Sequence, residues 1–183
     1  MKKINILLLG LAILFAACGD DRGAENTLRY DGDNLTAPLL EEDSYEAAAR
    51  FPSSITGAYT GQNLTQVSFF MAGTPLQSSL VIYEGGTADE PGVEVYSASL
   101  TGNITQNAFN AHVLSTPVPI TGEDLWISIK FRQNRTLQTI GCDAGPGSGD
   151  GDWLYRESDG RWLTFNQRTG EGINWNIRGV VSE

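Results

Sequence analysis

The chain has 183 residues, of which 22 are acidic and 12 basic, so its formal net charge at pH 7 is −10. Such a surface repels nucleic acid and anionic lipid, and neither is an expected partner. One histidine and two cysteines leave little material for catalysis by an imidazole or a thiol. The length fits one domain whose core is large enough to fold without disulfides.

The N-terminal segment has the pattern of an export signal. Lys2 and Lys3 precede an apolar run over residues 4–17, and Cys18 follows small residues directly. This order is typical of a secretory signal, and the run is shorter than the roughly 20 residues that span a bilayer. The sequence LFAAC at residues 14–18 resembles the lipobox of bacterial lipoproteins. That resemblance implies removal of residues 1–17 and lipidation of Cys18, so that the membrane is contacted through a lipid anchor.

The segment after the signal is small and polar. Residues 18–27 predict a flexible tether, and residues 28–183 predict a single domain. Asp20 and Asp21, close behind Cys18, resemble the surface-export signal of Bacteroidetes lipoproteins. We therefore expect a protein anchored in the outer membrane and exposed at the cell surface.

From Leu28 onward, short segments with period-two alternation are separated by Gly, Pro, Asn and Asp. Such segments predict strands, here over residues 41–50, 66–71, 80–83, 93–96, 110–114, 125–132 and 173–181. Residues 41–50 also have helical propensity, but their alternation favours a strand. Residues 153–156 and 161–165 predict a hairpin whose short loop uses Gly160. The spacing predicts an all-β fold, an antiparallel β-sandwich of jelly-roll type.

Several phrases occur in a fixed order along the domain: EAAARFP, LTQVSFF, LVIYEGG, EPGVEVYS, TPVPITGEDLWI, IGCDAGP and WNIRG. Together they resemble a β-sandwich module of large Bacteroidetes cell-surface and secreted proteins, related to the cleaved adhesin domains that accompany gingipains. The resemblance covers residues 28–181. It implies a non-catalytic jelly roll that serves in adhesion or binds carbohydrate or protein, often with structural calcium. The module is usually found in large proteins, whereas here we expect it to stand alone on a lipid anchor.

Two loops concentrate acidic residues beside glycine, one with Asp31 and Asp33 and the other with Asp143, Asp150 and Asp152. Calcium takes about six to eight oxygen ligands, which carboxylates and glycine-rich loop carbonyls can supply. The sequence therefore predicts a structural calcium site, with the second loop favoured. Neither loop has the spacing of an EF-hand. The alternative is that these residues are solvated turn residues, because Asp-Gly pairs favour turns.

Strand alternation predicts which tryptophans lie in the core and which are exposed. Trp175 shares a face with apolar neighbours and is expected in the core. Trp126 points to the same side as Lys130 and Arg132, opposite an apolar stripe, and is the best candidate for an exposed ring that stacks on a sugar; Trp162 ranks second. The predicted ligand-binding residues are therefore Trp126, Trp162, Lys130 and Arg132. The alternative is that a loop covers Trp126 and that its indole N–H is paired.

Catalysis finds little support in the chain. His112 is expected at the surface, and Cys142 is expected to be buried and inert, since a free cysteine behaves as a small hydrophobe. No nucleophile turn such as G-x-S-x-G is present, so we do not expect an enzyme. The favoured function is a non-catalytic surface lipoprotein that binds glycan or protein, for adhesion or nutrient capture. The alternatives are an accessory subunit of an outer-membrane complex that binds no sugar, and a glycan-active hydrolase built on two carboxylates.

Overall fold

The computed structural model describes residues 26–183. The expectations for the signal segment, for lipidation of Cys18 and for most of the tether lie outside these residues. The domain begins slightly before the predicted boundary at Leu28, since Thr27 already pairs with Val180 in the first strand. No helix in the described part of the chain is both long enough and apolar enough to cross a membrane.

The structure consists of strands with two short helices and one 3-10 turn. In chain order the elements are β1 (Thr27–Leu28), β2 (Leu39–Leu40), β3 (Asp43–Phe51), α1 (Ser53–Thr56), a 3-10 turn (Gly57–Tyr59), β4 (Asn63–Met71), β5 (Gln77–Gly86), β6 (Pro91–Ser99), β7 (Ala108–Pro119), β8 (Leu125–Gln133), β9 (Leu137–Gln138), β10 (Trp153–Arg156), β11 (Arg161–Thr164), α2 (Phe165–Thr169) and β12 (Ile177–Ser182).

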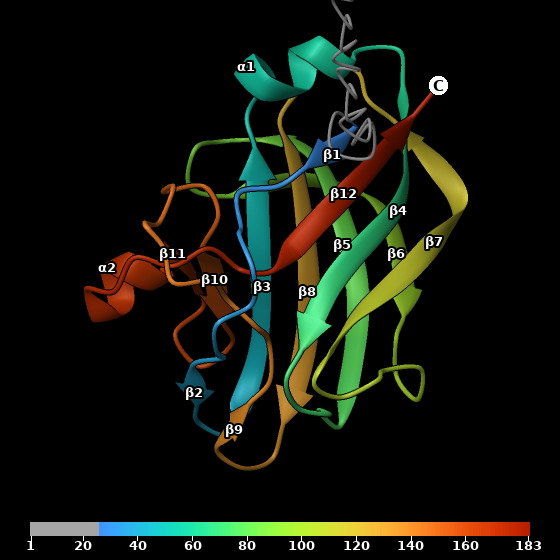
Figure 1. The fold of residues 1–183 in the computed structure, drawn as a ribbon. Coiled ribbons are helices and arrows are strands. Elements are labelled where there is room, and N and C mark those ends of the chain that lie inside the picture. Colours follow the sequence, from blue (N-terminus) through green and yellow to red (C-terminus); the bar gives the residue numbers. More distant parts are fainter. Residues whose placement is uncertain (1–25) are drawn as a thin grey trace, which may run out of the picture.

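The strands form two packed sheets. A four-stranded sheet has the order β1-β12-β4-β7, and a six-stranded sheet has the order β11-β10-β3-β8-β5-β6. Figure 1 shows β4, β7 and β12 in one layer in front of β3, β5 and β8 in the other. Strands β2 and β9 form a separate small pair.

Three strand pairs are nested in the sequence. Strand β3 pairs with β8, β4 pairs with β7, and β5 pairs with β6, all of them antiparallel. A long nested hairpin that winds across two sheets is the pattern of a jelly roll. The prediction of an all-β antiparallel sandwich of jelly-roll type is therefore confirmed.

Local predictions were correct for most strands. Residues 43–51 form β3, so the strand interpretation of that region is confirmed. The hairpin is also confirmed as β10 and β11, with Gly160 at a φ of 64°. The final strand is shorter than predicted, because Asn174 and Asn176 turn their side chains inward to bond Asp143 and Asp31. Both asparagines are buried, although they alternate with the apolar residues Ile173, Trp175 and Ile177.

The main core lies between the two sheets. Trp175 is 1% exposed, which confirms its predicted core position. Its ring packs edge-on against Phe165 at 5.5 Å, and its indole N–H donates to the carbonyl of Trp153 at 2.9 Å. Cys142 is buried as predicted, and burial raises the pKa of its thiol to about 11. A thiol with so high a pKa is almost entirely protonated at neutral pH and is a poor nucleophile.

Candidate functional site

One line of side chains crosses the outer face of the six-stranded sheet. Along β8, alternate residues enter the core and the others point outward, and directly opposed residues of antiparallel strands share a face. The register therefore places one residue of each strand in this line, which we call the outer row. From β11 to β6 it consists of Trp162, Tyr155, Glu46, Lys130, Ser79 and Ser99. With neighbouring strands about 4.8 Å apart, the row spans roughly 24 Å.

A cavity of about 340 Å³ lies at the β5–β6 end of the outer row. We call it the polar hollow; its lining residues are Ser44, Gln77, Ser78, Ser79, Ser99, Thr101, Lys130, Phe131 and Arg132. Two further hollows adjoin it through Ser44, one of them shared with Lys130 and the other with Arg132. Together they form a grooved polar surface across β3, β8 and β5.

Most polar side chains of the hollow have no partner in the protein. Within residues 26–183, the side chains of Ser44, Gln77, Ser79 and Ser99 make no hydrogen bond to another residue. Thr101 differs, because its hydroxyl both accepts from the amide of Ser78 and donates to its carbonyl. Unpaired hydroxyl and amide groups in a concave surface are available to the polar groups of a ligand.

Lys130 and Arg132 were both predicted to bind ligand, and the structure brings both to the polar hollow. Both side chains are exposed, and neither forms an ion pair with any described residue. Their role in binding stays a prediction, but their position supports it.

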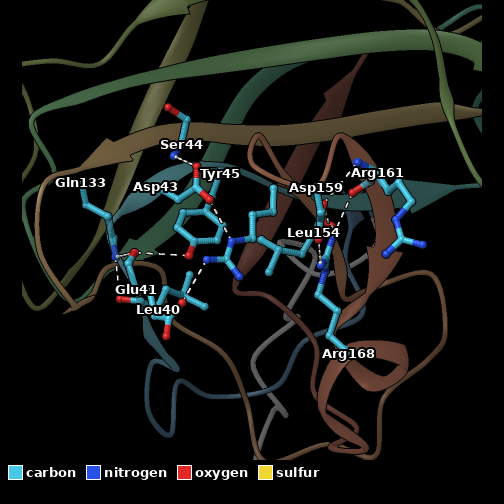
Figure 2. A network of polar contacts seen from close by, with 11 residues as sticks. Leu40, Glu41, Asp43, Ser44, Tyr45, Gln133, Leu154, Asp159, Arg161 and Arg168 are labelled. Atoms are coloured by element: carbon cyan, nitrogen blue, oxygen red, sulfur yellow. Dashed lines mark hydrogen bonds and ion pairs between the residues drawn. The ribbon is translucent and has the colours of Figure 1, made fainter.

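Two arginines on the neighbouring flank of the sheet are paired with carboxylates, unlike Lys130 and Arg132. Arg156 donates hydrogen bonds to the carboxylates of Asp43 at 2.8 Å and Glu41 at 2.9 Å. Figure 2 shows these two acids and, beside them, the contact of Arg168 with Asp159. Arg168 donates to Asp159 at 2.6 Å, and this hydrogen bond lowers the pKa of the Asp159 carboxyl. Both arginines line a larger hollow of about 500 Å³. Their charges are already balanced, so this second hollow has no unpaired cation to offer a ligand.

The prediction that Trp126 presents an exposed ring is wrong, because this residue is 0% exposed. Its ring lies against those of Trp153 at 5.3 Å and Trp162 at 5.7 Å, and the guanidinium of Arg50 lies 6.0 Å from it. The small Ala48 on β3 packs in the same cluster and leaves room for these rings. The indole N–H of Trp126 is buried without a partner in the described structure, so the paired alternative does not hold either. Alternation identified the face but could not show that large neighbours cover the ring.

Trp162 and Tyr155 provide the remaining aromatic surface of the outer row. Both are half-buried, and their rings lie 5.6 Å apart. Tyr155 also lines one of the adjoining hollows beside Lys130. Trp162 thus remains a candidate for a ring that stacks on a sugar. Tyr155 was missed, although its place directly opposite Trp162 in the predicted hairpin was a usable signal.

Glu46 lies at the centre of the outer row but is only 5% exposed. Its carboxylate accepts hydrogen bonds from the hydroxyls of Tyr83 at 2.8 Å and Ser128 at 2.5 Å. Burial raises the pKa of Glu46, and the hydrogen bonds from Ser128 and Tyr83 and the charge of Lys130 oppose that shift. Because internal donors hold this carboxyl, it ties β3, β5 and β8 together rather than facing a ligand. Sequence reasoning missed Glu46, since an acid within a strand gives no sign of burial.

The acidic loop residues predicted to bind calcium are engaged by donors of the protein itself. Asp143 accepts hydrogen bonds from the amide of Gly32 and from both the amide and the side chain of Asn174. Asp31 accepts from Arg178, with which it forms an ion pair at 2.8 Å. The two carboxylates thereby join residues 31–32 to the C-terminal strand region.

Donors of the protein also hold two of the three other predicted calcium ligands, and the third is exposed. Asp150 pairs with Arg50 at 2.8 Å, Asp152 accepts from the amide of Asn166, and Asp33 is exposed. Across residues 26–183, no three His, Cys, Asp or Glu side chains form a group that could hold a metal ion. The structure thus does not bring the loop carboxylates together, and calcium binding stays a prediction.

His112 is half-buried, not on a solvated face as expected, because it shares the inward side of β7 with the buried Asn110. Its Nε2 lies 2.9 Å from the hydroxyl of Tyr96, across the open side of the sandwich. A histidine held in this way connects β6 to β7.

No family model matches the chain, and no curated protein matches it. Among the solved structures that share its fold are two that contain parts of one protein. One is a clostridial cysteine protease, Cwp84, after propeptide cleavage, with a TM-score of 0.59 and 11% identity over 86% of this chain and 40% of that one. The other contains the cysteine protease and lectin-like domains of Cwp84, a surface layer associated protein of Clostridium difficile, with a TM-score of 0.56 and 10% identity over 84% and 37%.

Identities this low establish a shared fold and no more, and the chain spans about two fifths of the length of those structures. The fold and the site together define a class: a jelly-roll sandwich with a grooved, polar and partly aromatic outer sheet face.

Proposed function

We propose that this protein is a non-catalytic binding protein of the cell surface that takes a glycan along the outer row. The observation that carries the proposal is the set of polar side chains in the hollow that have no partner in the described structure. A sugar offers many hydroxyls that exchange hydrogen bonds with such groups, and its flat apolar face stacks on aromatic rings. Trp162 and Tyr155 supply those rings at the other end of the row.

The structural comparison supports the same class of function. One of the two similar structures includes a lectin-like domain and belongs to a protein associated with a surface layer. At 10% identity this similarity concerns the fold, and its extension to sugar binding is part of our proposal.

The proposed setting is an exported lipoprotein. A lipid at Cys18 would hold the domain at the outer membrane. The domain itself would be related to the gingipain-type adhesin modules. A single shallow site binds weakly, so many anchored copies would supply the avidity needed for adhesion or nutrient capture.

A glycan-array screen of the purified protein, run with calcium and again with chelator, tests the proposal. We expect specific binding that Trp162→Ala weakens by roughly tenfold, the change expected when one stacked ring is lost. Phe109→Ala is the matched control, because Phe109 is a 40% exposed ring on β7 in the other sheet. Absence of binding to every glycan in both conditions would refute the proposed function.

A second candidate function is favoured by the open side of the sandwich. The edge strands β6 and β7 carry the apolar side chains Val93 and Val113, which are 72% and 69% exposed. Exposed apolar groups on adjacent edges suit a protein partner, as an accessory subunit of an outer-membrane complex would require. Pull-down from outer-membrane extracts with the native protein and with Val113→Asp tests it: a partner lost on substitution supports this role, and a partner retained contradicts it.

A further inference from the structure

The polar hollow holds two basic side chains that form no ion pair, although the buried Glu46 lies opposite Lys130 on the neighbouring strand. Lys130 and Arg132 lie two residues apart on one face of β8, a rise of about 6.6 Å along the strand. Neither forms an ion pair with another described residue, and no residue that lines the hollow is acidic. Two positive charges this close repel each other, and an anion between them removes that repulsion.

Four of the other basic side chains in the described residues are balanced by carboxylates, whereas Arg29, Arg135 and Arg161 are exposed outside the hollow. Those that form ion pairs within the described residues are Arg50, Arg156, Arg168 and Arg178. The formal net charge of −10 repels anions in general. An anion that binds this protein must therefore be attracted by local charge, and the polar hollow is where two unpaired cations come together.

The carboxylates near the hollow restrict where the anion can lie. They are found toward β3 and β10, either in the adjoining hollows or buried within the row: Glu42, Asp43, Glu46 and Glu157. Glu46 is held by internal hydroxyl donors, and Asp43 accepts a hydrogen bond from Arg156. The side of the hollow toward β5 and β6 has none of these acids among its lining residues and carries the hydroxyls of Ser79 and Ser99.

We propose that the glycan bound by the outer row is acidic, and that its carboxylate or sulfate group lies between Lys130 and Arg132. The neighbouring hydroxyls of the same sugar then bond to Ser79, Ser99 and Gln77, which have no partner in the described structure. Arginine offers a planar fork that fits either anion, and lysine adds a point charge. This inference rests on the proposed glycan-binding function and specifies its ligand class.

Matched pairs of polymers that differ in charge alone test the inference with the purified protein. Polygalacturonate is compared with its methyl ester for the carboxylate, and dextran sulfate with dextran for the sulfate. The variants are Lys130→Gln, Arg132→Gln and the double variant. Arg29→Gln is the control, because Arg29 is an exposed arginine next to β1 in the other sheet and its loss changes the net charge equally.

We expect at least one charged polymer to bind more tightly than its neutral form. Each single variant is expected to lose roughly tenfold in affinity, the usual effect of one hydrogen bond to a charged group. Arg29→Gln is expected to have no effect, and thermal unfolding should show that all variants remain folded. Binding should also weaken as salt is raised.

Equal binding of charged and neutral forms, or full binding by the double variant, would overturn the acidic-ligand inference and leave the glycan-binding function standing. Failure of all four polymers, together with every neutral and acidic glycan of the array, would overturn the proposed function itself. The two failures are thereby distinguished.

Discussion

Trp126 and Trp175 offer a matched test of what an unpaired indole N–H costs this fold. They are 0% and 1% exposed, so replacing either by phenylalanine removes the same atoms from an equally buried site. They differ in the N–H group. The N–H of Trp175 donates to the carbonyl of Trp153 at 2.9 Å, whereas that of Trp126 has no partner in the described structure.

The two substitutions are therefore expected to differ in free energy of unfolding. Each loses roughly 1–2 kcal/mol from the smaller ring and the space that it leaves. Trp126→Phe regains about as much, because it removes a buried donor whose desolvation is uncompensated, and it should be nearly neutral. Trp175→Phe loses about 1 kcal/mol more with its hydrogen bond. We expect Trp175→Phe to be less stable than Trp126→Phe by about 2 kcal/mol or more.

Urea unfolding followed by far-UV circular dichroism measures the difference, since the fluorescence of the variants is not comparable. The slope of the unfolding free energy against urea concentration should be the same for all variants, so that differences between their midpoints report differences in stability. Trp126→Ala is expected to lose about 3–5 kcal/mol, which shows that the ring itself contributes to the fold. If Trp126→Phe costs as much as Trp175→Phe, the reasoning about the unpaired N–H is wrong.

Four further predictions concern buried groups. Burial raises the folded-state pKa of Glu46, so its ionised form destabilises the fold as the pH rises. Glu46→Gln should therefore stabilise the protein at pH 7 and lose that advantage below pH 4.5, the ordinary pKa of the group. Urea titrations at several pH values check this prediction. Cys142 should resist a thiol reagent at pH 7 and react once urea unfolds the chain, since its pKa is raised to about 11; fast labelling of the native protein would contradict its burial. Gly179→Ala should cost about 1–3 kcal/mol by overpacking, because its Cβ would lie 2.7 Å from Cδ1 of Ile127; thermal unfolding measures it. Calcium binding predicts heat in isothermal titration after chelation, reduced by Asp143→Asn, and no heat at millimolar calcium would end that proposal.

Much of the fold was accessible from the sequence. Period-two alternation assigned the core face of β8 and the core position of Trp175, and the turn at Gly160 identified the hairpin. These features depend on neighbours a few residues apart, and local backbone geometry is enough to decide them. The outward direction of Lys130 and Arg132 was determined in the same way.

The alternation failed where side chains on one face cover each other. Trp126 points outward as predicted, yet rings from β10 and β11 bury it. Asn174 and Asn176 alternate like solvent-facing residues but are buried, because distant carboxylates accept their hydrogen bonds. Exposure is a property of the assembled surface, and no local pattern contains it.

The sequence by itself determined the fold class, most strands and the face on which most of the strand side chains lie. The tertiary structure decided which side chains meet. The polar hollow draws Ser44 from β3, Gln77 and Ser79 from β5, Ser99 from β6 and two cations from β8, strands far apart in the chain. Strand order and register bring them together, and both are fixed by packing between sheets and by pairing between distant segments, which a single sequence does not display.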